Sequence, residues 1–216
     1  MFQKCASVRD VEIHMPSSKH KQAESVEGVM TREERRQKLE AFGSAPALLA
    51  RALRQIPKKM WMYKVSPDTW SIHEIILHLA DNEANAYIVC RLMIAEPGSH
   101  ALMFNPTLWA GSLGYFHQST KEALEIIRRL RRMTHHVLAA LPETVWSHRA
   151  DPREESALTL DNWLEQQERH IPAQITQMQN IYELWAKTHP PRKLPSPRSH
   201  NPSGIESRYS SLSVRT

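Results

Sequence analysis

The feature that most constrains the fold is a set of four long segments whose apolar residues recur every three or four positions. This spacing predicts α-helices over about residues 31–56, 71–95, 118–141 and 159–187. No convincing alternation of apolar and polar residues lies between them, so no β-strand is predicted. Helices of matched length joined by loops bury their apolar faces in a bundle. The sequence therefore predicts an all-α protein built as a four-helix bundle.

Three of the predicted helices begin at recognisable capping signals. Thr31 and Glu34 in TREE, and Ser71 and Glu74 in WSIHE, have the spacing of a capping box. In that motif the first side chain accepts from the backbone of the fourth residue, whose own side chain accepts from the backbone of the first. The last helix is predicted to begin at Thr159, in TLDNWL. These signals mark where the three helices start.

Two features of the sequence leave the continuity of the first helix and the relative directions of consecutive helices open. The first helix contains Gly43 and Pro46, so we expect it to be interrupted or kinked near these residues. The connections over 96–117 and 142–158 are long. Connections of that length allow consecutive helices to run parallel as well as to form simple hairpins.

The two ends of the chain differ in composition from the central part. We predict an N-terminal tail over 1–30, a bundle domain over 31–187, and a disordered basic Pro/Ser-rich tail over 188–216. The formal net charge is +5, and residues 189–216 contribute +4 of it, from five basic residues and one acidic residue. The bundle is therefore almost neutral, which excludes it as a nucleic-acid-binding platform.

Nothing in the sequence points to a membrane or to an oxidising compartment. No apolar run reaches the length of a transmembrane helix, and the first residues lack the apolar stretch of a signal peptide. The two cysteines, Cys5 and Cys90, do not form a disulfide framework, and Cys90 with its basic neighbour Arg91 is a candidate nucleophile. We therefore expect a soluble cytoplasmic protein.

The second predicted helix carries more apolar residues than one buried face requires. Its main stripe has helical spacing and comprises Ile72, Ile75, Ile76, Leu79, Ala86, Tyr87, Cys90 and Met93. Leu77, Ile88 and Leu92 form a second apolar set away from that stripe. This set indicates either a helix buried on two sides or the interface of a homodimer. His78 lies beside the main stripe, where a histidine is either a hydrogen-bonded boundary residue or a metal ligand.

The last predicted helix contains an unusual stretch, ERHIPAQITQM, over 168–178. A proline within a helix removes a backbone donor and displaces the carbonyl four residues earlier, so Pro172 calls for an explanation. Pro172 is either a tolerated kink or a bend that sets the direction of His170 and position 174. These two positions share one face of the helix, as paired ligands must. Position 174 is Gln174.

These two stretches together resemble the DinB/YfiT-like family of four-helix-bundle metalloenzymes. The resemblance rests on WSIHEIILHLADNEANAYIVCRL, over 70–92, and on RHIPAQITQM, over 169–178. Its most specific parts are the Trp-Ser opening, the His-Leu-Ala-Asp segment and the histidine of the last helix. It extends over roughly residues 31–187, and it implies a bundle with up-down-down-up topology.

The resemblance also implies a divalent metal, zinc or nickel, held by one histidine from the second helix and an H-x-x-x-H pair from the fourth. On this sequence those ligands correspond to His78, His170 and position 174. The chain departs from the pattern there, because Gln174 offers a weaker donor than imidazole. We therefore expect a degenerate His/His/Gln site of low occupancy, unless a neighbour such as Asp81 or His117 completes it.

Two functions remain open at this point. The resemblance implies a metal-dependent enzyme acting on a small molecule, with a transferase or isomerase that uses a low-molecular-weight thiol as one candidate. In that case Asp81 or Glu83 would orient a ligand. The alternative is a non-catalytic dimeric helix bundle, or a small-molecule-binding protein, that retains a relic metal site. The missing third histidine favours the alternative, whereas the retained His78 and His170 favour the enzyme.

Overall fold

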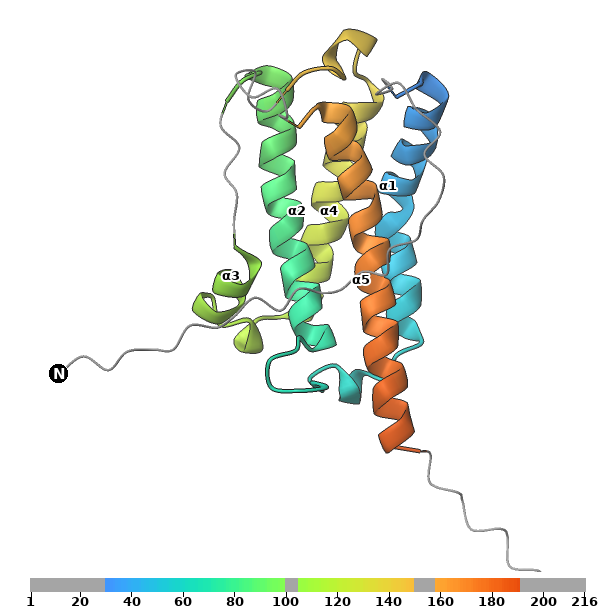
Figure 1. Ribbon diagram of the computed structural model, residues 1–216, viewed down its shortest axis with the longest axis vertical. Coiled ribbons are helices and arrows are strands. Elements are labelled where there is room, and N and C mark those ends of the chain that lie inside the picture. The colour runs from blue at the N-terminus through green and yellow to red at the C-terminus, as the bar shows by residue number, and fades with distance from the viewer. Residues whose placement is uncertain (1–29, 100–104, 150–157, 191–216) are drawn as a thin grey trace, which may run out of the picture.

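The computed structural model describes residues 30–99, 105–149 and 158–190, and this part of the chain forms a four-helix bundle (Figure 1). The four long helices are α1 (Arg32–Arg54), α2 (Ile72–Ala95), α4 (Thr120–Ala139) and α5 (Leu160–Thr188). Shorter elements connect them: η1 (Lys58–Met60), α3 (Pro106–Ser112), η2 (Tyr115–His117) and η3 (Glu143–Val145). The predicted all-α fold is confirmed, but the sequence pattern did not predict these shorter elements.

The helix starts lie where the capping signals predicted them. The Thr31 hydroxyl accepts from the backbone N–H of Glu34 at 3.2 Å, and the Ser71 hydroxyl accepts from Glu74 at the same distance. In both cases the glutamate side chain accepts in return from the backbone of the capping residue, which completes the capping box. Thr159 caps α5 in the same way, with Asn162 in the place of the glutamate. Each box satisfies backbone donors that a helix start otherwise leaves without partners.

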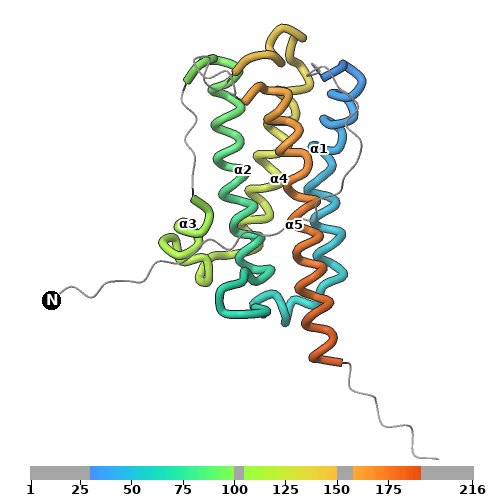
Figure 2. The backbone as a smooth tube through the Cα atoms, viewed as in Figure 1, coloured from blue at the N-terminus to red at the C-terminus, as the bar shows by residue number. Residues whose placement is uncertain are grey.

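The chain order of the helices gives two parallel pairs. Helices α1 and α5 run in one direction, and α2 and α4 run in the other (Figures 1 and 2). The most extensive packing is within these parallel pairs, and α1 with α4 and α2 with α5 pack over smaller areas. The bundle therefore has four seams, and the α2–α5 seam lies on the opposite side from the α1–α4 seam. This arrangement confirms the up-down-down-up topology.

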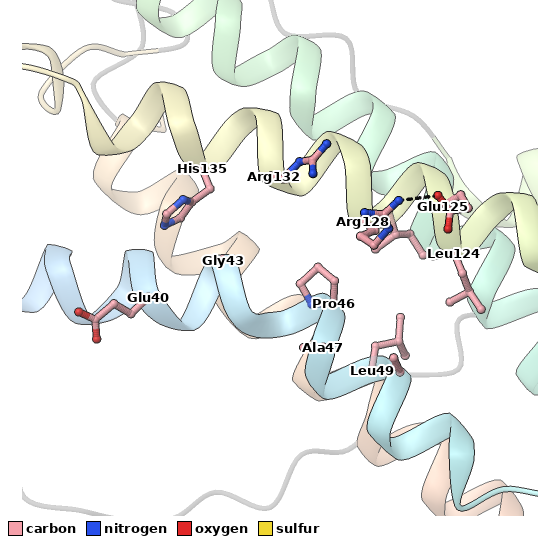
Figure 3. A pocket seen from close by; sticks show the side chains of 12 residues that line it. Glu40, Gly43, Pro46, Ala47, Leu49, Leu124, Glu125, Arg128, Arg132 and His135 are labelled. Carbon is pink, nitrogen blue, oxygen red and sulfur yellow. Dashed lines mark hydrogen bonds and ion pairs between the residues drawn. The ribbon is translucent and has the colours of Figure 1, made fainter.

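Helix α1 is continuous through Gly43 and Pro46, so of the two expected alternatives, an interruption or a kink, the interruption does not occur. The helix does bend beside Pro46 (Figure 3), as expected where a proline ring displaces the carbonyl of Phe42. Gly43 has a separate reason to lack a side chain. A Cβ atom at this position would lie 2.8 Å from the ring of His135 on α4.

The core is divided by a layer of charged side chains. One cluster of buried apolar residues includes Leu49, Ile75 and Ile171, and a second includes Cys90 and Leu164. Most of the predicted α2 stripe is buried in these clusters, and Tyr87 is half-buried. Glu83 and Arg131 are buried at the level between the two clusters. Since a buried charge requires a charged partner, this layer ties α2 to α4 at a fixed depth.

A second buried ion pair ties the first long helix to the last. The Arg35 guanidinium donates to both carboxylate oxygens of Asp161 on α5, at 2.8 and 2.9 Å. Its side chain also lies over the ring of Trp146, 4.7 Å from the centroid. This fork-shaped contact fixes the register of the two helices more closely than a single hydrogen bond would.

The second apolar set on α2 has two different environments. Leu77 is buried in the core, so it cannot contribute to an interface with another subunit. Ile88 is 53% exposed and, with Leu92, lines a groove of about 260 Å³ beside Trp109 of α3. The homodimer therefore remains a prediction, and only Ile88 and Leu92 of the three residues are available for it.

Two further predictions concern the membrane and the tails. None of the described helices contains a stretch that is long and apolar enough to cross a membrane. The predicted tails, apart from the few residues next to the bundle, lie outside the described residues. The domain boundaries and the disorder of the basic tail therefore remain predictions.

Candidate metal centre

The first candidate ligand, His78, lies on the buried side of α2. The capping box at Ser71 fixes the start of the helix, and His78 follows two turns later. Its side chain is only 7% exposed. The ring of Trp70 packs edge-on against it, with ring centroids 4.9 Å apart. His78 is therefore buried and held in position, not a residue at the solvent boundary.

The structure brings His170 of α5 against His78. The two imidazole rings meet edge to face, with centroids 5.3 Å apart and an angle of 89° between their planes. Helix α5 is unbroken from Leu160 to Thr188 and includes Pro172. Pro172 removes the hydrogen bond that a backbone N–H would otherwise donate to Glu168, yet α5 keeps His170 and Gln174 one turn apart on one face.

His170 and Gln174 each have a polar side-chain atom that is buried without a hydrogen-bond partner. These atoms are Nδ1 of His170 and the side-chain oxygen of Gln174. An unsatisfied buried polar atom destabilises a fold by about 1–3 kcal/mol, so such atoms are uncommon and point to a ligand or a functional role. The chemistry of the set fits a divalent cation, because imidazole nitrogen and amide oxygen are both metal donors.

The protonation states also suit a cation-binding site. Burial lowers the pKa of His78, although the nearby Asp81 carboxylate opposes this effect. Burial lowers the pKa of His170 to about 4, and the positive charges of His78 and Arg131 act in the same direction. Both imidazoles are therefore neutral at pH 7. A metal binds the neutral form, so no proton has to be displaced near neutral pH.

Arg131, which affects His170 electrostatically, is the most deeply buried cation near the site. Its side chain is fully buried and forms an ion pair with Glu83, with one contact from Nε at 2.9 Å and a second from Nη2. It also donates to the backbone carbonyl of Gln167 on α5 at 3.1 Å. Its guanidinium lies 4.0 Å from the centroid of the Phe42 ring. Arg131 therefore touches the other three long helices and holds the α5 turn that precedes His170.

The other residues considered from the sequence do not complete a ligand set. Asp81 accepts a hydrogen bond from the Tyr115 hydroxyl, and Glu83 is engaged by Arg131. His117 is exposed on η2, beside Phe116. Within the described parts of the chain, no three His, Cys, Asp or Glu side chains converge as a metal-binding group. The suggestion that Asp81 or His117 supplies a third strong donor is therefore not supported.

Cys90 is not an activated nucleophile. It is fully buried, and burial raises the pKa of its thiol to about 12, which the charge of Arg91 only partly opposes. The reactive form of a cysteine is the thiolate, and almost none is present at neutral pH with such a pKa.

The sequence did contain a signal for the Arg131–Glu83 pair, which the helical patterns alone did not interpret. Arg131 occupies the position between Ile127 and Thr134 on the buried face of α4. Glu83 occupies the corresponding position between Leu79 and Ala86 on α2. A charged residue at a core position is rarely buried alone, so opposite charges at core positions of two helices predict a pair.

Comparison with known proteins identifies relatives of the fold. The model of the DinB superfamily matches residues 41–171 of the chain. No curated protein matches it significantly. Among solved structures, the chain is similar to YfiT from Bacillus subtilis, with a TM-score of 0.65 and 18% sequence identity over 79% of this chain and 93% of that one. YfiT is described as "a probable metal-dependent hydrolase with an unusual four-helix bundle topology".

Proposed function

Because the chain belongs to the DinB superfamily, we propose that it is a metal-dependent enzyme whose divalent cation is held by His78, His170 and Gln174. The observation that carries this proposal is the contact between the buried imidazole of His78 and the half-buried imidazole of His170, 5.3 Å apart at their centroids, beside the unsatisfied oxygen of Gln174. Within the described part of the bundle, no other pair of contacting histidine rings joins two helices.

The donor set determines what kind of cation the site accepts. Two imidazoles favour zinc or nickel, and three protein donors leave positions for water or substrate. The amide oxygen is the weakest of the three donors, so the site binds its metal less tightly than three histidines would. When bound, such a cation lowers the pKa of a water or thiol beside it and so supplies a nucleophile near neutral pH.

The chain's own residues hold the donors in place. Trp70 packs against His78 and limits the access of water to it. Arg131 holds the Gln167 carbonyl, and the Gln167 side chain accepts from Asn82 of α2 at 3.2 Å. These contacts tie the α5 turn before His170 to α4 and α2. The ligands therefore lie on rigid helices, which is how a site keeps its geometry without the metal.

The relatives support two candidate reaction classes. Hydrolysis agrees with the description of YfiT, and a transfer or isomerisation using a low-molecular-weight thiol agrees with the wider family resemblance. A second candidate function is a non-catalytic bundle with a relic site. Gln174 favours this second candidate, since it stands where the third imidazole is expected and is a weaker donor.

Direct metal analysis tests the proposal. Protein purified without an affinity tag should bind zinc or nickel in a one-to-one ratio by calorimetric titration, and His78→Ala and His170→Ala should each abolish that binding. His136→Ala is the matched control, because His136 is exposed on α4. Equal binding by all four proteins would exclude this site, and the absence of binding to the unaltered protein would leave the relic bundle as the function.

A further inference from the structure

A cavity of about 670 Å³ lies along the α1–α4 seam (Figure 3). This seam is on the opposite side of the bundle from the α2–α5 seam, which holds His78 and His170. Its apolar lining includes Pro46, Ala47 and Ala50 of α1, and Leu124 and Ile127 of α4. The space exists because α1 presents small residues toward α4, so the two helices cannot fill the seam between them. The volume is within the usual range for small-molecule sites.

The acidic groups around this cavity are already engaged by arginines. Glu40 forms an ion pair with Arg36 at 2.6 Å, and its carboxylate is turned away from α4 (Figure 3). Glu125 accepts from Arg128 at 2.7 Å and from Arg129 at 3.3 Å. Neither carboxylate therefore offers a free negative charge to a ligand in the cavity.

One cation at the cavity has no such partner. Arg132 lines the cavity, is exposed, and forms no hydrogen bond or ion pair with the described residues. His135, one turn further along α4, lines the same side and approaches Gly43. The cavity thus combines an apolar floor with a charged edge, and this edge carries one guanidinium that is available for an anion.

We propose that the α1–α4 cavity binds an amphipathic carboxylate, such as a medium-chain fatty acid. The apolar part of the ligand lies over Ala47, Ala50 and Leu124, and its carboxylate accepts from Arg132. A planar guanidinium pairs with a carboxylate through two parallel hydrogen bonds, which gives the ligand a defined orientation. This site shares no residue with the candidate metal centre, so the two sites can be tested separately.

The test uses decanoate and decanol, which share an alkyl chain and differ in the charged group. Calorimetric titration of the full chain should show that decanoate binds about tenfold more tightly than decanol. Arg132→Gln should remove that difference and leave decanol binding unchanged. Arg129→Gln is the matched control, because Arg129 is exposed on the same helix and does not line the cavity. It should bind both molecules as the unaltered protein does.

A second variant tests the apolar part of the cavity. Ala47→Trp should fill the space and abolish binding of both molecules, whereas Ala41→Trp, on an exposed part of α1 outside the cavity, should not. Equal affinity for decanoate and decanol, or an unchanged preference in Arg132→Gln, would overturn the proposal. A change in oligomeric state caused by Ala47→Trp would overturn it too, because a second copy of the chain would then be the occupant of this seam.

Discussion

The α2–α5 seam and the α1–α4 seam are opposite sides of one bundle, and they are lined by different kinds of side chain. The α2–α5 seam brings together two neutral imidazoles, one buried and one half-buried, and a buried amide oxygen that lacks a hydrogen-bond partner. The α1–α4 seam has small apolar residues, and the acidic groups at its edge are engaged by arginines. The α2–α5 seam therefore brings candidate metal donors into contact, whereas the α1–α4 seam leaves a cavity between its helices.

This difference shows how a single helical scaffold can offer two kinds of site. Donors that meet a metal must converge, so they require closely packed helices and tolerate little empty volume. A site for an apolar ligand requires the opposite, namely missing side-chain volume between two helices. Glu83 is on α2 and Arg131 is on α4, so their ion pair joins one helix of each seam.

The largest expected effect comes from removing the layer on which both seams depend. Arg131→Ala leaves Glu83 buried without its partner, and it should lower the free energy of unfolding by about 3–5 kcal/mol in urea denaturation. Arg132→Ala, at the exposed next position, should change it by less than about 0.5 kcal/mol. Replacing both members of the pair, as Arg131→Met with Glu83→Leu, should recover most of the loss. If Arg131→Ala and Arg132→Ala lowered the free energy of unfolding by similar amounts, the Arg131–Glu83 ion pair would not be what stabilises the packing at the two seams.

The next effect tests whether the α2–α5 seam lacks only one donor. Gln174→His should tighten zinc binding about a hundredfold, which corresponds to about 2.7 kcal/mol. The melting temperature in the presence of zinc should rise as well, since a ligand that binds only the folded state stabilises it. His78→Ala in the same background should cancel the gain, and Gln177→His, on an exposed position of α5, should not reproduce it. If Gln174→His changes neither quantity, positions 78, 170 and 174 do not converge on one cation.

A third prediction concerns the effect of acid on the stability of the metal-free protein, which is measured in the presence of a chelator. The pKa of His170 is about 4 in the folded protein, against an ordinary value of 6.5. Between these values the unfolded chain binds more protons than the folded one, so the free energy of unfolding falls as the pH falls. From pH 6.5 to 5, where most carboxylates stay ionised, the fall should be about 1.6 kcal/mol. His170→Gln should flatten this dependence, and an equal slope in both proteins would contradict the assignment.

The smallest effect separates function from stability at Gln174. If its buried oxygen is retained for a ligand, Gln174→Met should stabilise the metal-free protein by about 1 kcal/mol, because it removes an unsatisfied polar atom. Gln177→Met, at an exposed position of the same helix, should have no comparable effect. Thermal denaturation of the two variants measures the difference. A destabilised Gln174→Met variant would indicate that the oxygen has a partner in solution.

The sequence predicted the bundle well because its signals are local. The capping residues Thr31, Ser71 and Thr159 specify helix starts through contacts only three residues away. The pairing of His78 with His170 could not come from spacing, since the two residues are on different helices and were linked only by family resemblance. The α1–α4 cavity was not predicted either. Its volume is set by how far apart two helices lie, and a helical pattern specifies which face is apolar without specifying that distance.

The pairing of α1 with α5 has a consequence for the order in which the chain folds. Arg35 and Asp161, which lock the two helices together, are 126 positions apart in the sequence. Contacts of such high sequence separation form late, because a long loop must close before they stabilise anything. During synthesis, α1 cannot pack against α5, its main partner, until this last helix has been made. The part of its apolar face that α5 covers is therefore exposed until the last helix has been made, and a chain that stops before α5 leaves that part without its partner.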